Sequence, residues 1–368
     1  MKYVDEYRDD RLAKSLVAQI RSMVTRRWVL MDVCGGQTHG LVRNGIEEAL
    51  AEDVELIHGP GCPVCVTSTE AIDFAQQLAK RDYVILCSFG DMMRVPGSCG
   101  SLLDVRSQGG HVAPIYTPMD AVTMASEMPE SQIVFFAVGF ETTAPATALA
   151  VLQAERRGLE NFSLLVSHVR VLPAMETLMR APDNRVDAFL AAGHVCTITG
   201  YEAYTPFANK YSVPIAITGF EPIDLLRGIH EVVRQRESGR HEVVNCYARS
   251  VREAGNFAAM KAINEVYEVA DQSWRGFGIV ADGGLRLRER YLQFDAQRRF
   301  DTAISMPTID RSGCRSGDVL AGRIKPIQCE HFGGKCQPDH PLGAPMVSSE
   351  GACAAYHRYR SQQETTIR

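Results

Sequence analysis

Short apolar segments alternate with amphipathic segments up to about residue 240. The apolar segments are largely β-branched and have the length of buried strands; they occupy residues 27–33, 54–57, 82–89, 111–116, 132–138, 162–167, 186–192 and 213–218. Segments with a helical spacing of apolar positions separate several of them, for example 69–81 and 146–158. Strands that alternate with helices and read as continuous apolar runs are typical of parallel sheets covered by helices. The pattern therefore predicts an α/β protein with Rossmann-like parallel sheets.

The same pattern suggests a division into domains. The sequences LCSFGDMM, FAVGFETT and AITGFEPI each end a predicted strand with glycine and an acidic residue, which indicates similar α/β units. A turn-forming stretch near 116–121 and a polar stretch after residue 235 are candidate boundaries. We therefore expect two similar α/β domains at 1–118 and 119–240, and a third domain at 241–368.

The character of the chain changes in that third part. One helix is predicted from Glu253 to Val269, and the sequence after it is rich in glycine, proline, cysteine and histidine. Such a segment cannot form a good apolar core alone, and units below roughly 70–80 residues usually need a metal or cross-links. Its spaced cysteines lack the close C-x-x-C knuckle of structural zinc sites; they are Cys314, Cys329, Cys336 and Cys353. Four thiolates in a glycine-rich segment favour an iron–sulfur cluster, with zinc as the alternative.

Composition and charge narrow the class of protein. A net charge of −5 on 368 residues gives no basic field for nucleic acid. The charged N-terminus lacks the apolar core of a signal peptide, and no apolar run has the length of a membrane span. We therefore expect a cytoplasmic protein without membrane association. In that compartment, eleven cysteines predict metal binding or thiol chemistry rather than a disulfide framework.

The segment MDVCGGQTHG holds the first candidate site. Cys34 follows a predicted strand, at the end where α/β proteins bind ligands, and two glycines allow a tight turn there. The start of the next helix is expected to favour the thiolate of Cys34, which is both a nucleophile and a metal ligand. His39 is a candidate second ligand, proton donor or hydrogen-bond partner. The alternative for Cys34 is a buried cysteine beside a helix start.

The segment GPGCPVC holds the second candidate site. Thr67 and Glu70 match a capping box, so a helix is expected to begin directly after Cys65. A C-x-x-C pair at a helix start, here Cys62 and Cys65, is more typical of a redox dithiol than of a zinc site. Zinc remains the alternative, because Cys34, His39 or His58 could complete its ligands.

The segment GFETTAP holds a weaker candidate. Glu141 ends a predicted strand and could serve as a proton relay or ligand clamp, or only cap the following helix. His168 and His194 also lie near strand ends, and we interpret them as structural. The remaining cysteines have no ligand-like spacing and are interpreted as buried free thiols; they are Cys87, Cys99, Cys196 and Cys246.

Together, CGGQTH, GPGCPVC, GFETTAP and the late sequence MVSSEGACAAY resemble the HypD family of hydrogenase maturation proteins over essentially the whole chain. The resemblance implies two similar α/β domains and a C-terminal domain that holds a [4Fe–4S] cluster. It implies a role in assembling the Fe(CN)2CO group of [NiFe] hydrogenases with the partner HypC. Cyanide would come from HypE, which works with HypF.

The resemblance also implies roles for particular residues. Cys34 would hold the transient iron, carrying CN and CO, together with a cysteine of HypC. Cys62 and Cys65 would form a thiol–disulfide pair between that iron and the cluster. The cluster ligands would be Cys314, Cys329, Cys336 and Cys353. Some family members have histidine where this chain has Gln37, so an acid–base role there does not carry over, and His39 is the remaining imidazole.

Two other functions compete with this one. The chain could be a free-standing iron–sulfur protein-disulfide reductase, although such an enzyme does not need the second thiolate site at Cys34. It could also be a zinc-stabilised binding module without catalysis. Visible charge-transfer absorbance, which an iron–sulfur cluster has and zinc lacks, separates the last of these from the others.

Overall fold

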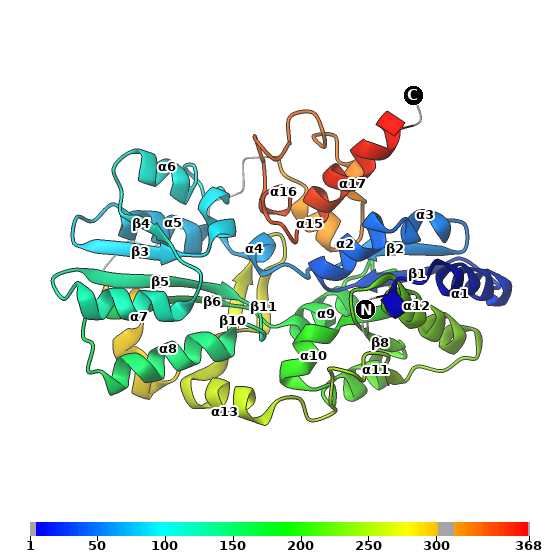
Figure 1. Ribbon diagram of the computed structural model, residues 1–368, viewed down its shortest axis with the longest axis horizontal. Helices are drawn as coiled ribbons and strands as arrows, with labels where there is room; N and C mark the ends of the chain where they lie inside the picture. The colour runs from blue at the N-terminus through cyan, green and yellow to red at the C-terminus, as the bar shows by residue number, and fades with distance from the viewer. Residues whose placement is uncertain (1–4, 301–312, 367–368) are drawn as a thin grey trace.

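The computed structural model describes residues 5–300 and 313–366, and it contains two parallel sheets side by side along the long axis of the molecule (Figure 1). The first sheet has the strand order β2-β1-β7-β8-β9 and the second has the order β4-β3-β5-β6. The strands are β1 (Trp28–Asp32), β2 (Val54–His58), β3 (Val84–Ser88), β4 (Val112–Pro114), β5 (Gln132–Gly139), β6 (Phe162–His168), β7 (Ala188–Ala192), β8 (Ile215–Thr218) and β9 (Val243–Asn245). The predicted α/β class is confirmed, and the eight predicted strands correspond to β1–β8.

Helices cover both faces of each sheet, and short helices follow several strands directly (Figure 1). The α-helices are α1 (Asp10–Met23), α2 (Gly35–Arg43), α3 (Ile46–Ala49), α4 (Pro63–Val66), α5 (Thr69–Ala79), α6 (Leu102–Ser107), α7 (Pro118–Glu127), α8 (Ala144–Arg156), α9 (Val171–Arg180), α10 (Gly193–Thr199), α11 (Tyr204–Tyr211), α12 (Pro222–Glu237), α13 (Phe257–Val266), α14 (Ala296–Arg299), α15 (Ser316–Leu320), α16 (Ala344–Val347) and α17 (Ala352–Thr366). Short 3-10 helices occupy Asp5–Tyr7, Gly90–Arg94, Glu289–Phe294 and Pro326–Gln328.

The two sheets are built from non-contiguous parts of the chain. After β2 the chain leaves the first sheet, forms all of the second sheet, and returns as β7 beside β1. The expected boundary at residue 118 does not separate the sheets, because β3 before it pairs with β5 after it. The boundary at 240 also differs from the observed arrangement, since β9 beyond it pairs with β8. Local periodicity cannot show such a crossover, because it reports each strand without its partner.

A hairpin that the sequence pattern did not predict connects the two halves. Strands β10 (Tyr267–Trp274) and β11 (Gly278–Leu287) pair antiparallel. The predicted helix Glu253–Val269 is confirmed only in part, because α13 ends at Val266 and the chain continues into β10. Trp274 is buried in an apolar cluster that includes Cys34 and Phe140, so the hairpin packs into the junction between the sheets.

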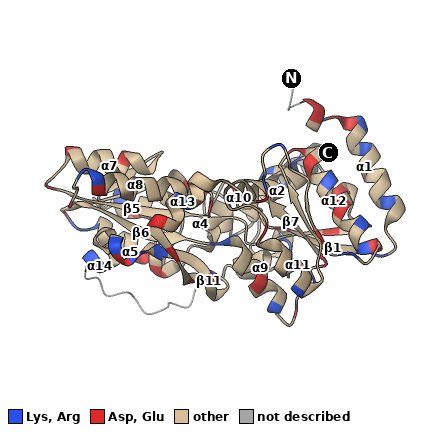
Figure 2. Cartoon of the chain, turned by 90° about the horizontal axis from the view of Figure 1, so that it is seen from below, with Lys and Arg blue, Asp and Glu red and all other residues tan. Residues whose placement is uncertain are grey.

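The C-terminal segment with α15, α16 and α17 lies against this junction, on the side of α2 and α4 (Figure 1). Figure 2 shows acidic and basic positions interspersed along the outer helices rather than gathered by sign. Within the described ranges, no helix combines the length and the apolar character that a membrane crossing requires.

Candidate functional site

The loops that follow β1 and β2 are packed backbone to backbone. The two strands are parallel partners, with Asp32 opposite His58, so both loops leave the same edge of the sheet. A side chain at Gly61 would lie 2.3 Å from the Cys34 backbone, and Gly35 N donates to Gly61 O at 3.1 Å. Only glycine permits this approach, which brings CGGQTH and GPGCPVC together.

Cys34 is a buried thiol at the first turn of α2. Burial raises its pKa to about 12, while the backbone N–H groups of Gln37 and Gly36 act in the opposite direction. The expectation that the helix start favours the thiolate is therefore corrected, because the loss of hydration outweighs the helix N–H groups. Without a bound cation, Cys34 is a neutral thiol at neutral pH.

His194 is the imidazole beside this thiol. Its Nδ1 lies 3.6 Å from Cys34 Sγ, and it occupies the first turn of α10, directly after β7. Burial lowers its pKa to about 4, so the ring is neutral and keeps a lone pair. A thiol and a neutral imidazole are donors that suit borderline and soft metal ions. The interpretation of His194 as merely structural missed this contact.

His39 points elsewhere. Its Nδ1 lies 3.4 Å from the Tyr359 hydroxyl on α17, and the two rings meet edge to face. Burial is the main reason that its pKa is lowered, and the charge of Arg358 adds to the effect. In this fold the imidazole that lies beside Cys34 is therefore His194 and not His39.

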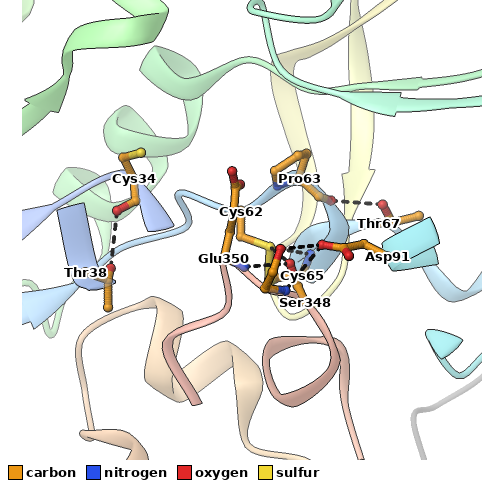
Figure 3. The surroundings of a disulfide bond; sticks show 10 residues. Cys34, Thr38, Cys62, Pro63, Cys65, Thr67, Asp91, Ser348 and Glu350 are labelled. Atoms are coloured by element: carbon orange, nitrogen blue, oxygen red, sulfur yellow. Dashed lines mark hydrogen bonds between the residues drawn. A yellow bond between two sulfur atoms is a disulfide. The ribbon is translucent and has the colours of Figure 1, made fainter. Parts of the chain in front are cut away.

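The loop Ser348–Glu350 closes the site from the C-terminal segment. A side chain on Gly35 would lie 2.1 Å from the Glu350 carbonyl oxygen, so this loop rests on the start of α2. Burial raises the pKa of the Glu350 carboxyl, and the charge of Asp91 raises it further. The Glu350 charge in turn raises the Cys34 pKa. Figure 3 shows the Glu350 side chain between Cys34 and the Cys62–Cys65 pair.

Cys62 and Cys65 form a disulfide with their Cα atoms 5.3 Å apart. Cys62 caps the one-turn helix α4, and its Sγ accepts from Cys65 N at 3.2 Å. The expected capping box of Thr67 and Glu70 is absent; Thr67 Oγ1 donates to the Pro63 carbonyl, and Ser68 caps α5. The pair therefore belongs to a separate short helix before α5.

The four C-terminal cysteines line one cavity. Apolar residues such as Leu342 and Met346 complete its wall together with Cys314, Cys329, Cys336 and Cys353. The thiols are close enough to affect one another, since burial and the neighbouring Cys314, Cys336 and Cys329 raise the Cys353 pKa well above its usual value. A side chain at Gly343 would lie 2.2 Å from Cys314 Sγ, so only glycine fits there.

The chemistry of these four residues fits an iron–sulfur cluster. In the described part of the chain, no three or more His, Cys, Asp or Glu side chains are arranged to hold a metal ion. A tetrahedral zinc site needs four donors around one point, whereas a four-iron cluster keeps its ligand sulfurs farther apart. Four thiols around a common cavity are the donors that such a cluster uses.

Glu141 lies in the loop between β5 and α8, and its side chain reaches the start of α9. Its Oε1 accepts from Val171 N at 3.1 Å, and burial raises the pKa of the carboxyl. Its charge also raises the pKa values of Cys196 and Tyr204, which places these two side chains nearby. The carboxylate therefore contacts the start of α9 and does not cap α8, the helix that follows it in the chain.

A buried chain of polar groups fastens α17 to the strand ends. His58 Nδ1 lies 2.5 Å from Asp32 Oδ2, and His58 Nε2 lies 2.9 Å from the Tyr356 hydroxyl. That hydroxyl donates to Glu47 Oε2 at 2.6 Å, and Lys325 pairs with the same carboxylate. Charge-assisted hydrogen bonds of this kind are strong when buried. They fix the C-terminal segment beside both cysteine loops.

Replacing Tyr356 by phenylalanine is expected to lower the free energy of unfolding by about 1–3 kcal/mol, because two buried polar groups lose a partner. The measurement is the shift of the denaturant midpoint. Tyr359→Phe is the matched control, since that hydroxyl is half-buried and lies 3.4 Å from His39. It should cost less than about 0.5 kcal/mol. Equal effects of the two substitutions would contradict the stabilising role of the buried chain of polar groups.

The structure therefore defines an α/β protein with two parallel sheets and three groups of cysteine residues near their junction. The HypD family model, described as "Hydrogenase formation hypA family", matches residues 11–360. The chain is 43% identical over 376 residues to the hydrogenase maturation factor HypD of Azotobacter vinelandii, covering 100% of this chain and 99% of that protein. Identity to HypD of Escherichia coli K12 is 43% over 371 residues, covering 99% of both.

The chain therefore belongs to the HypD family of hydrogenase maturation factors, as its motifs predicted. A relative from Cupriavidus necator is 41% identical over 369 residues, which cover 98% of this chain and 97% of the relative. The role of this chain lies in the maturation of [NiFe] hydrogenases.

Proposed function

We propose that this chain is the scaffold on which an iron ion receives its cyanide and carbonyl ligands, with Cys34 as the iron ligand. The observation that carries the proposal is the group of Cys34, His194 and Glu350 at one edge of the first sheet. A thiolate is a strong donor that suits a low-spin iron with cyanide and carbonyl ligands. The iron is the cargo of this site, which hands it on.

The proton of Cys34 has a nearby acceptor. Iron binding requires the thiolate, so the thiol must lose its proton as the ion arrives. His194, with a pKa of about 4, is a poor acceptor. Glu350 is the better one, because burial raises its pKa. In the proposal Glu350 takes the proton, and the neutral ring of His194 stays available to hold or hydrogen-bond the incoming group.

Other proteins complete the site in this proposal. A cysteine of HypC is the second iron ligand, and HypE delivers cyanide that HypF helps to supply; the family resemblance supports these partners. We place this work in the cytoplasm, where nine free cysteines beside one disulfide suit a reducing environment. Neither nucleic acid nor a membrane takes part.

The other two thiol groups provide electrons in the proposal. Cys314, Cys329, Cys336 and Cys353 would hold a [4Fe–4S] cluster, which when bound supplies electrons one at a time. Cys62 and Cys65 exchange two electrons between their disulfide and dithiol forms. The pair is suited to this task by its place, since Cys62 contacts Ser348 and the next residues of that loop reach Asp91 and the start of α2.

Complementation tests the proposal. In a bacterial strain that lacks its own HypD, this chain is expected to restore hydrogenase activity, and Cys34→Ala to leave activity at background. Cys246→Ala is the control, because it removes a thiol that packs in a different apolar cluster. Hydrogenase activity with Cys34→Ala at the level of the control would remove Cys34 from the mechanism.

A further inference from the structure

Three consecutive residues of the C-terminal segment contact three different parts of the site. Ser348 Oγ lies 3.2 Å from Cys62 Sγ. Ser349 Oγ donates to Asp91 Oδ2 at 2.7 Å. Glu350 rests on Gly35 beside Cys34. Figure 3 shows this loop running past the disulfide toward Cys34. The first of these contacts has a definite direction.

The hydrogen-bond partners of the Ser348 hydroxyl determine where its proton points. Its oxygen accepts from Glu350 N at 3.2 Å, so its own proton is available for another acceptor. The sulfur of Cys62 in the disulfide carries no proton, and the bond between the two side chains must therefore run from Ser348 to Cys62. Ser348 is 1% exposed, so water does not compete for this proton.

The two sulfurs of the pair have unequal surroundings. Cys62 Sγ receives a second hydrogen bond, from Cys65 N at 3.2 Å. Cys65 Sγ accepts no hydrogen bond from the residues that the structure describes, and its side chain is fully buried. A negative charge is stabilised by donors and destabilised by burial without them. The surroundings therefore favour negative charge on Cys62 over Cys65.

We propose that Ser348 is a positioning residue that makes Cys62 the thiolate of the reduced pair. This inference rests on the proposed redox role of Cys62 and Cys65. In the reduction, the Sγ–Sγ bond breaks and accepts two electrons from a thiol or iron–sulfur donor. Cys62 becomes a thiolate and Cys65 takes one proton to become a thiol. Ser348 stabilises the product more than the disulfide, because a thiolate is a stronger acceptor than a disulfide sulfur.

Equilibration of the full-length protein with glutathione buffers measures this effect. The Cys62–Cys65 disulfide is quantified by thiol alkylation after an acid quench and peptide mass analysis. Ser348→Ala is expected to lower the equilibrium constant for reduction roughly tenfold, which corresponds to a potential about 30 mV more negative. Ser349→Ala is the matched control; it removes the neighbouring hydroxyl, and its constant should stay within about twofold of the wild type.

A second readout uses limited alkylation of the reduced protein. Cys62 is expected to react before Cys65 in the wild type, and the preference is expected to fall in Ser348→Ala but not in Ser349→Ala. Equal potentials for the two serine variants, or earlier reaction of Cys65, would overturn the inference and leave the redox proposal intact. If no glutathione ratio produced the disulfide even in the wild type, the proposed redox function would fail together with the inference.

Discussion

Cys353→Ser is expected to reduce the iron and sulfide content of anaerobically purified protein to less than roughly a tenth of the wild-type value. Cys353 is one of four thiols around a single cavity, and burial, followed by the other three thiols, raises its pKa. A serine oxygen is a poor donor for the iron of such a cluster, so the visible charge-transfer absorbance should disappear with the iron.

The control for this substitution is Cys99→Ser, which changes an exposed cysteine outside the cavity. It should keep the wild-type spectrum. A Cys353→Ser protein with full absorbance would show that this cysteine is not a cluster ligand. A wild-type protein that carried zinc and had no visible absorbance would instead support the zinc-stabilised alternative.

Replacing both Cys62 and Cys65 by alanine is expected to leave the cluster intact and to impair hydrogenase maturation. The cluster cysteines lie in another segment, so the visible spectrum should persist, whereas hydrogenase maturation in the complementation strain should fall at least about a hundredfold. The reason is that a two-electron carrier has been removed. The double substitution avoids a single unpaired thiol, and hydrogenase activity shows the effect.

Cys99→Ala combined with Cys246→Ala is the matched double control, because neither thiol belongs to a site group. This control should mature hydrogenase normally. Wild-type maturation by the Cys62→Ala/Cys65→Ala protein would show that the dithiol is dispensable, and the electron-transfer part of the proposal would then be wrong.

Apolar runs predicted the strands of the two sheets because buried parallel strands are apolar on both faces. They missed the strands with a solvent-facing side. In β10, exposed and half-buried positions alternate between a buried Tyr267 and a buried Trp274, and the beginning of this strand was assigned to the preceding helix. Strand β9 is only half-buried along its three residues, so no apolar run marks it.

Strand-end reasoning placed Cys34 at a ligand-binding edge, and the structure brings the Cys62–Cys65 pair to the same edge because β1 and β2 are parallel neighbours. It could not find His194. That residue follows β7, which pairs with β1 only after the whole second sheet has been formed. The loop Ser348–Glu350 was missed for the same reason, since Ser348 contacts a cysteine 286 positions earlier.

The protonation state of Cys34 was also outside the reach of sequence reasoning. A helix start lowers a thiol pKa, and this effect is present here through the N–H groups of Gln37 and Gly36. How deeply the thiol is buried depends on residues distant in sequence, including Phe220 and Glu350 against the glycines of the loop. Burial is the larger effect, so the free thiol is neutral, and in the proposed function the iron must displace its proton.

Infrared spectroscopy of the complex with HypC tests the central claim, that Cys34 holds the iron while its ligands are added. The wild-type complex is expected to show the stretching bands of cyanide and carbonyl bound to iron. Complexes that contain Cys34→Ala should lack these bands, and those with Cys246→Ala should retain them. Cyanide and carbonyl bands of wild-type intensity in the Cys34→Ala complex would contradict the assignment of Cys34 as the iron ligand.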